Sequence, residues 1–517
     1  MAAFFQLPDR RVVPNWRDYK TTVILGELDA TKKVKPDFKV DISKQIRDWE
    51  ISNSMGTAAD LLGSVYLSNE RENDRIIEAS KFILKNKDNA STPLIKLANE
   101  IINPQQSSVG NPIDSIEIKD LLEVNSDQSL QHIINLIRSV KSNINTNPFN
   151  AIWWVELSRL YSIIGQNQQA MRAMQIAVNL SPNNRFVLRA ATRLFIHFDE
   201  PDKALHYLRK SITTKSDPWL LSAHIATSAI LNKHQVNANL GRDMLASKNF
   251  SDFNMTELSS SLGTLEFFSG AIKSSKKYFE IAQKAPNDNT LAQLEWVSQK
   301  DQRFVFNQVL LSHVSNSYEA FAIEHFENGN WAESAKNSIK WFYDMPYSSR
   351  PVVLGSFICS AFLDDQEAAI KLCNLGLIAN PNDITVLNNL MYACLLANKV
   401  EYAITASKSI NISRMDVTDE SVIMLQATTG LLSFRQGNIE EGKRLYQLAI
   451  ENAKAIRRKD LELLANINFL RELLMNNCPE VEGVFYHLST LSEKDIKLYI
   501  LKLKEKVVLL YHSKKKV

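Results

Sequence analysis

Three charged residues of this chain have the types and order of a metal-dependent nuclease site. Asp114 is followed by Glu117 and Lys119, a pattern of carboxylates and a lysine that can support metal-assisted phosphodiester cleavage. Such a site needs the aspartate and the Glu-x-Lys element on adjacent strands, and three residues are too few to form the turn between them. We therefore favour an exposed, charged helix start over a nuclease site.

The histidines and serines give no stronger indication of catalysis. His197 and His206 are nine residues apart across a predicted turn, and the chain has no HExxH motif. Ser274 and Lys277 have SxxK spacing, but they belong to a Ser-Ser-Lys-Lys run expected on an exposed helix. Phosphate-binding GxxxxGK[ST] and GxGxxG motifs are absent. The sequence therefore predicts a protein that is not an enzyme, with no catalytic residue, no metal site and no cofactor.

The four cysteines are spaced as buried thiols. Cys359, Cys373, Cys394 and Cys478 occur singly in apolar stretches, without CxxC spacing. Unpaired, reduced thiols are typical of intracellular proteins. The first residues are too short and wrongly charged for a secretory signal, and the most apolar window, 352–363, is too short to cross a bilayer. We expect a cytoplasmic protein without a membrane span.

The charge balance says little about partners. The formal net charge is +3 in 517 residues, whereas nucleic-acid-binding chains usually carry a larger or clustered basic excess. The clearest cluster is in residues 491–517, which contain eight lysines and three acidic residues. A solvated capping helix is the favoured interpretation, and weak contact of these C-terminal lysines with nucleic acid is the alternative.

Any binding site must be positioned by helices, because the chain is poor in helix breakers. Glycine and proline number 15 each, about 3% apiece, where typical usage is roughly 7% and 5%. Residues 151–184 show a pattern of large, small and turn residues that returns after 34 residues. The first copy consists of Trp154, Leu157, Ser158, Tyr161, Gly165, Ala170, Met174, Ala177, Leu180 and Pro182, and the second of Leu188, Ala191, Thr192, Phe195, Ala204 and Leu208.

This pattern describes a hairpin of two helices. Small side chains at Ser158 and Ala170 allow two helices to cross closely, while the large residues fill the space beside the crossing. Gly165 predicts the turn between the helices, and Pro182 ends the second one. Such a hairpin cannot bury its own apolar faces alone, so it requires neighbours.

The pattern resembles the tetratricopeptide repeat (TPR) family. The resemblance implies an all-α fold, a right-handed α-solenoid of TPR-like helical hairpins, preceded here by a short extended N-terminal arm. Weaker copies follow in the rest of the chain. They are marked by Leu262, Gly263, Phe267, Gly270, Phe279, Ala282 and Pro286, by Gly329, by Ala369, Leu387, Leu390 and Ala403, and by Gly430, Phe434, Gly437, Tyr446 and Ala449.

We expect five regions along the chain. They are an extended arm at 1–45, a helical region at 46–146, TPR-like repeats at 147–300, degenerate repeats at 301–475, and capping helices with a lysine-rich tail at 476–517. The arm either folds back on the stack or reaches to a partner. Helices are expected at 42–65, 73–85 and 93–102, with a linker at 104–112.

The family resemblance also implies where ligands bind. TPR ligands usually lie on the concave side, which the first helix of each hairpin lines. Carried over to this chain, that face presents Arg159, Phe186, Arg189 and Arg193. Because arginine captures carboxylates well and an aromatic ring adds apolar anchoring, we expect an acidic or aromatic peptide segment there. The alternative is a solvated face of exposed arginines that pair with Glu156, Asp199 or Glu200.

Two amides on a later copy are a second candidate. Asn388 and Asn389 follow each other on a predicted first helix, where an amide could hold an extended backbone. They are equally well explained as surface polar residues.

These observations favour a scaffold or adaptor that binds one or more partner proteins in the concave groove. The first alternative is a regulatory or sensor subunit of a separately encoded enzyme, on which the arm, with Trp16 and Tyr19, would dock. The second is an RNA-binding helical repeat, although base-contacting positions do not recur in every copy. A catalytic domain within 1–146 is the least favoured, because this region has one histidine and no cysteine.

Overall fold

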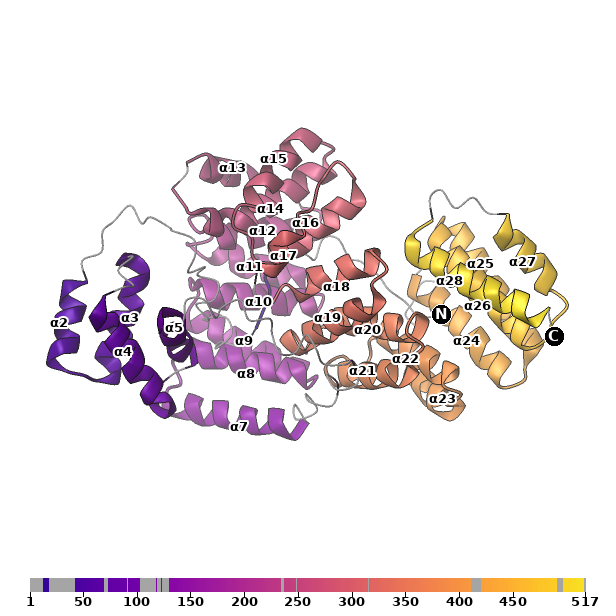
Figure 1. The fold of residues 1–517 in the computed structure, drawn as a ribbon, viewed down its shortest axis with the longest axis horizontal. Coiled ribbons are helices and arrows are strands. Elements are labelled where there is room, and N and C mark those ends of the chain that lie inside the picture. Colours follow the sequence, from indigo (N-terminus) through magenta and orange to yellow (C-terminus); the bar gives the residue numbers. More distant parts are fainter. Residues whose placement is uncertain are drawn as a thin grey trace. The chain divides into compact units, whose positions relative to one another are not determined.

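The computed structural model describes most of the chain as helices. The described residues are 13–17, 42–68, 73–90, 92–102, 118, 122, 130–233, 237–247, 249–314, 316–410, 420–490 and 496–515. Within these ranges every regular element is an α-helix, apart from a short 3-10 helix at Lys87–Asn89. The chain divides into two compact units, one formed by 17–116 and the other by 1–16 together with 117–517 (Figure 1).

In its described residues, the smaller unit has four helices around a core of its own. They are α2 (Ser43–Ile51), α3 (Met55–Ser68), α4 (Asp74–Lys85) and α5 (Thr92–Ile102). Trp49 and Ile76 are among the residues buried between them. The helices expected at 73–85 and 93–102 are therefore present, and the one expected at 42–65 is two helices. The expected linker and the residues Asp114, Glu117 and Lys119 lie outside the described residues.

The larger unit is a succession of antiparallel helices (Figure 1). Its first half contains α7 (Leu130–Thr146), α8 (Ala151–Ile163), α9 (Asn167–Leu180), α10 (Arg185–His197), α11 (Pro201–Lys210), α12 (Pro218–Ile230), α13 (Ala238–Ser247), α14 (Asp252–Phe268), α15 (Ile272–Ala282) and α16 (Asp288–Lys300). Its second half contains α17 (Val309–Ser312), α18 (Tyr318–Glu327), α19 (Trp331–Asp344), α20 (Arg350–Ala361), α21 (Gln366–Ala379), α22 (Ile384–Leu396), α23 (Val400–Lys408), α24 (Glu420–Arg435), α25 (Ile439–Ala455), α26 (Lys459–Met475), α27 (Val481–Ser489) and α28 (Leu498–Lys514).

Within the hairpins, the two helices cross at small residues 12 positions apart. The Ser158 hydroxyl on α8 donates to the carbonyl of Ala170 on α9 at 2.7 Å. The same spacing recurs where Ser275 on α15 donates to the carbonyl of Gly263 on α14 at 2.8 Å. A larger side chain at either position would separate the helices. The close crossing expected from Ser158 and Ala170 is confirmed.

The turns between the helices have a common left-handed residue. Gly165 has φ +69°, and the following N–H, of Gln166, donates to the carbonyl of Tyr161 at 2.9 Å. Gly270, Gly329 and Gly437 also have positive φ, and each is followed by the same type of N–H donor. This is the Schellman ending of a helix, which favours glycine because it has no Cβ.

Other hairpins make this turn without glycine. Asp199 has φ 57° and Asn398 has φ 58°, and Asn232 and Asp364 are also left-handed. Asparagine and aspartate tolerate this conformation better than other residues with a Cβ. Several copies that appear degenerate in sequence are therefore intact hairpins, and the chain is an all-α helical repeat of TPR-like hairpins.

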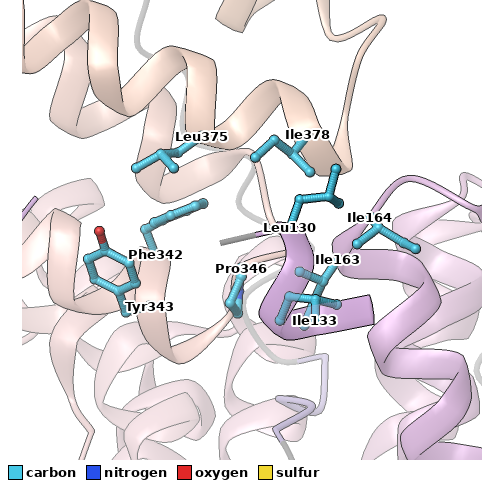
Figure 2. Close-up of a pocket in the computed structure, with 9 residues that line it drawn as sticks. All are labelled: Leu130, Ile133, Ile163, Ile164, Phe342, Tyr343, Pro346, Leu375 and Ile378. Carbon is cyan, nitrogen blue, oxygen red and sulfur yellow. The ribbon is translucent and has the colours of Figure 1, made fainter. Parts of the chain in front are cut away.

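Hairpins far apart in the sequence meet beside α8. A Cβ added to Gly165 in the α8–α9 turn would lie 2.8 Å from the carbonyl oxygen of Ile378, so the turn and the end of α21 are in close contact. An apolar pocket lies at this junction, and Tyr343 is on its rim (Figure 2). Burial raises the pKa of Tyr343 to about 12. The pocket is lined by Leu130, Ile133, Ile163, Ile164, Phe342, Tyr343, Pro346, Leu375 and Ile378.

Helix α28 packs along α26 and also reaches α18. The Tyr499 ring is buried 5.4 Å from that of Phe326 on α18, and the Lys506 ammonium lies 2.7 Å from the carboxylate of Asp364. The C-terminal helix therefore joins the last hairpins to the middle of the array.

Candidate peptide-binding site

The most unusual polar contact in the larger unit is made by Arg193. It lies on α10, which begins at the N-cap Asn184, and its side chain is 9% exposed. Its Nε donates to the carbonyl of Pro14 at 2.6 Å, and its Nη2 donates to the carbonyl of Val13 at 2.8 Å and to Asn15 Oδ1 at 3.0 Å. A residue of the repeat therefore holds an irregular piece of chain about 180 positions away in sequence.

This piece, Val13–Trp16, is called the N-terminal segment below. Val13 is 0% exposed and Trp16 is 1% exposed, and both belong to the same apolar core as helices α8 to α12. Asn15 is held at both ends of its amide, because its Nδ2 also donates to Asp288 Oδ2 at 2.5 Å. For the described part of the arm, the structure thus shows the folded-back alternative.

Tyr347, in the loop between α19 and α20, holds the end of the segment. Its hydroxyl donates to the carbonyl of Trp16 at 3.1 Å, and the two rings are 5.3 Å apart. The His197 ring packs edge-on against Tyr347 at the same distance of 5.3 Å. We call Arg193, His197, Asp288 and Tyr347 the segment site.

The segment site is suited to holding an extended backbone. Three carbonyls, those of Val13, Pro14 and Trp16, accept hydrogen bonds from side chains of the repeat. Carbonyls are present in every peptide, so these contacts give affinity without selecting a sequence, whereas the enclosed Val13, Asn15 and Trp16 side chains give selectivity. The Arg193 guanidinium suits this role because its planar group holds several N–H donors in fixed directions and can donate to more than one acceptor at once.

Arg189, one turn before Arg193, has a different role. Its guanidinium forms two hydrogen bonds with the carboxylate of Glu257 on α14, at 2.5 and 2.9 Å, and lies 4.4 Å from the Trp219 ring centre. Glu257 is 1% exposed and also accepts from Asn287 Nδ2 at 2.8 Å. The expectation of an exposed arginine here is wrong, because the partner carboxylate is buried between helices.

The other predicted groove residues are also engaged within the chain. Arg159 pairs with Glu156, three positions earlier on α8, at 2.5 Å, as the alternative interpretation had it. Phe186, at the start of α10, packs against the apolar core. Of the three arginines expected to converge, Arg193 is the one that contacts the N-terminal segment.

Asn388 and Asn389 lie inside the helix packing. Each is 1% exposed on α22, so neither is a surface residue. The Asn389 amide donates to Ser356 Oγ on α20 at 3.1 Å and to the carbonyl of Val353 at 3.3 Å. A backbone ligand would reach these amides only if α20 and α22 separated.

A second buried polar cluster joins the C-terminal hairpins. Glu472 on α26 is 0% exposed and pairs with Arg435 on α24 at 2.5 Å and with Arg471 at 2.8 Å. Arg471 also donates to the Tyr392 hydroxyl on α22, which donates to Asn468 Oδ1, both at 3.0 Å. The cluster connects three successive first helices.

The residues considered for catalysis are dispersed in the structure. His197 contacts Tyr347, whereas His206 contacts Tyr207 at 5.4 Å. In the described ranges, no group of three or more His, Cys, Asp or Glu side chains could hold a metal ion. The four cysteines are buried and make no disulfide, and burial raises the pKa of Cys373 to about 12.

Sequence reasoning missed Val13, Asn15, Asp288 and Tyr347. An irregular segment has no periodicity, and nothing in the sequence joins residue 15 to residue 288. The one available signal was Trp16, a large aromatic residue in an arm rich in proline. Its type indicated a buried contact but not the surface that buries it.

The site and its hairpins define a TPR-like helical repeat. The sequence matches no family model and no curated protein. Among solved structures, that of yeast Tom70 is similar, with 12% sequence identity and a TM-score of 0.32 over 76% of this chain and 96% of that chain. In the part of the chain that the structure describes, no helix is long and apolar enough to cross a membrane.

Proposed function

We propose that this chain is a non-catalytic interaction scaffold that binds a partner protein through an extended segment of that partner. The observation that carries the proposal is the convergence of Arg193, Asp288 and Tyr347, from three separate parts of the array, on four residues of irregular chain. Repeat arrays use distant hairpins in this way to hold extended peptides.

The contacts favour an aromatic partner segment over an acidic one. Trp16 is enclosed with Tyr347, whereas Arg159 and Arg189 already pair with Glu156 and Glu257. A buried, paired guanidinium cannot capture a second carboxylate without leaving the first one uncompensated. Of the two ligand types expected, acidic and aromatic, we therefore propose the aromatic one.

The lysines of α28 support a protein partner over nucleic acid. Lys506 pairs with Asp364 at 2.7 Å, Lys515 with Glu482 at 3.0 Å, and Lys514 donates to the carbonyl of Leu474 at 2.7 Å. The charges of Lys506 and Lys515 are thus partly compensated within the chain, which reduces their attraction for phosphates, whereas the carbonyl that Lys514 contacts carries no charge.

The proposal is tested by capture from a nuclease-treated lysate of the native cells. A synthetic peptide with the sequence of residues 11–18 serves as competitor, and the same peptide with Asn15 and Trp16 replaced by alanine is the matched control. We expect one stoichiometric protein that the first peptide displaces and the control does not. If that protein is an enzyme, the chain is its regulatory subunit. Capture that nuclease abolishes would contradict the proposal and favour RNA binding.

A further inference from the structure

We propose that the N-terminal segment is a built-in competitor for the segment site. The external ligand is a partner's extended segment with the same chemistry, an apolar residue followed two positions later by Asn-Trp. This inference rests on the proposed function, since it names the ligand class of the same site.

The segment that now occupies the site shows which side chains the site requires. Val13 and Trp16 are almost fully enclosed, so their positions demand an apolar and a large aromatic side chain. Asn15 is the only one of the four with a polar side chain, and it both accepts from Arg193 and donates to Asp288. An aspartate there would face Asp288, and an apolar residue would leave Asp288 without this donor. The position of Asn15 is thus the one that distinguishes between possible ligand segments, and it requires asparagine.

The helices and the loop that carry the site are held in place by contacts that do not involve the segment. Arg189 and Glu257 fasten α10 to α14, and Asn287 fastens the start of α16, next to Asp288, to the same carboxylate. The carbonyl of Tyr347 accepts from the Asn380 amide at 2.9 Å. A site whose supporting helices and loop are fixed by other contacts can accept a replacement segment without a change of the backbone around it.

The segment is attached by side chains and by apolar enclosure. Within the described residues it belongs to no helix and no sheet, and in the sequence residues 17–42 separate it from α2 of the smaller unit. The effective concentration of a tethered ligand has an upper limit of about 1 mM, the value for short flexible linkers. If the intrinsic dissociation constant of the segment is about 10 μM, an external peptide binds the intact chain up to roughly 100-fold more weakly than a chain whose tether is cut.

The experiment uses the full chain with a protease site inserted between Leu25 and Gly26, so that folding is complete before the tether is cut. Binding of a fluorescent peptide of residues 11–18 is followed by polarisation before and after cleavage. We expect up to about 100-fold tighter binding after cleavage and removal of the fragment by dilution. The peptide with Asn15 and Trp16 replaced by alanine should not bind.

Two variants of the cleavable chain locate the binding to the segment site. Arg193→Gln should weaken peptide binding by at least tenfold, because glutamine cannot serve all three acceptors. Arg444→Gln, an exposed arginine paired with Glu441 on α25, should bind as the parent does. Circular dichroism of each variant checks that the helices remain folded.

Several outcomes would overturn the inference. The fragment could leave only when the helices unfold, which would make Val13–Trp16 a permanent part of the core. Equal peptide binding by cut and uncut chains would show that the segment does not compete. Concentration-dependent dimers of the uncut chain that the peptide dissociates would assign the site to a second copy instead of a partner. A different result separates the two proposals: if the peptide exchanges as expected but the cleaved chain, freed of its fragment, captures no protein from the lysate, the proposed function fails and the binding site stands.

Discussion

Two regions of the larger unit place arginine side chains against buried polar groups, and the partners of these arginines differ. In the C-terminal region, Arg435 and Arg471 pair with the buried carboxylate of Glu472, and all three belong to neighbouring repeat helices. In the N-terminal region, Arg193 donates to carbonyls of the N-terminal segment, which is not part of any hairpin. In the first region the partners of the arginines come from the repeat helices themselves. In the second region they come from a segment outside the repeats.

The difference shows how a repeat can carry a structural and a binding arginine in similar environments. A guanidinium opposite a buried carboxylate is tied to it, because separation leaves two uncompensated charges. A guanidinium opposite carbonyls can exchange them for those of another segment at little electrostatic cost, since every peptide offers the same group. Arg189 and Arg193 show both cases one turn apart on α10.

The largest effect should come from removing the Glu472 carboxylate, which pairs with Arg435 and Arg471. Glu472→Gln leaves Arg435 and Arg471 without their common counter-charge and should lower the free energy of unfolding by about 3–5 kcal/mol. Urea denaturation followed by circular dichroism measures this loss. The control is Glu441→Gln, which breaks the exposed pair with Arg444 and should leave the midpoint unchanged. Equal effects of the two changes would show that the buried cluster is not structural.

The next largest effect should come from Trp16→Ala. Its cost in the free energy of unfolding has an upper limit, which the cost of Glu472→Gln does not have. Truncating a buried tryptophan typically costs about 3–5 kcal/mol when the chain stays in place. Here the tethered segment can leave, so the loss cannot exceed the free energy that seats it. Adding Val13→Ala to Trp16→Ala should then change stability by less than about 0.5 kcal/mol further, although the two sites share one core. Urea denaturation of both single variants and the double variant measures this, and full additivity would contradict a replaceable segment.

The two arginines on α10 should respond unequally to lysine. Arg189→Lys cannot keep both hydrogen bonds to Glu257 and should cost about 1–3 kcal/mol, because a buried carboxylate oxygen loses its donor. Arg193→Lys should cost less, since the segment can withdraw instead of leaving buried groups unsatisfied. Both are measured by thermal and urea denaturation. A larger loss of stability in Arg193→Lys than in Arg189→Lys would assign the structural role to Arg193.

The smallest effect concerns the turn that leads into α26 and so positions Glu472. Arg457 is exposed and left-handed, with φ 58°. Arg457→Gly should stabilise the chain by about 1 kcal/mol by removing the steric cost of a Cβ in this conformation. Gly437→Ala, in the preceding turn with φ 82°, is the matched opposite change and should destabilise the chain. A loss of stability in Arg457→Gly would mean that its side chain contributes more than its backbone strain.

The sequence was sufficient for the repeat where glycine marks the turn and insufficient where it does not. Gly165 and Gly437 were recognised, whereas Asp199 and Asn398 occupy the same left-handed position and gave no sign of it. The turn requires a conformation, not a residue type, and two polar residues can adopt that conformation at a modest cost. The crossing of Ser158 with Ala170 was predictable because it depends on residues 12 apart.

The candidate site was only partly predictable. Arg193 could be assigned to the inner face through the resemblance to the TPR family. The burial of Arg189 could not, because its partner Glu257 is 68 residues away. The contact of Arg193 with Val13 and Asn15 spans about 180 residues and follows no periodic pattern. The repeat pattern thus indicates on which face of a helix a residue lies. Which group its side chain contacts depends on residues far away in the sequence.

On the proposal made above, the N-terminal segment occupies its site as a ligand and not as a fixed part of the core. Hydrogen exchange of the Asn15 and Trp16 amides in the intact chain, compared with the amides of α10, tests this directly. We predict that the two segment amides exchange through a local opening at least about 2 kcal/mol less costly than the opening of α10, with little dependence on denaturant. Exchange of both sets at the same rate, and with the same denaturant dependence, would show that the segment and the helices open together and would contradict the account.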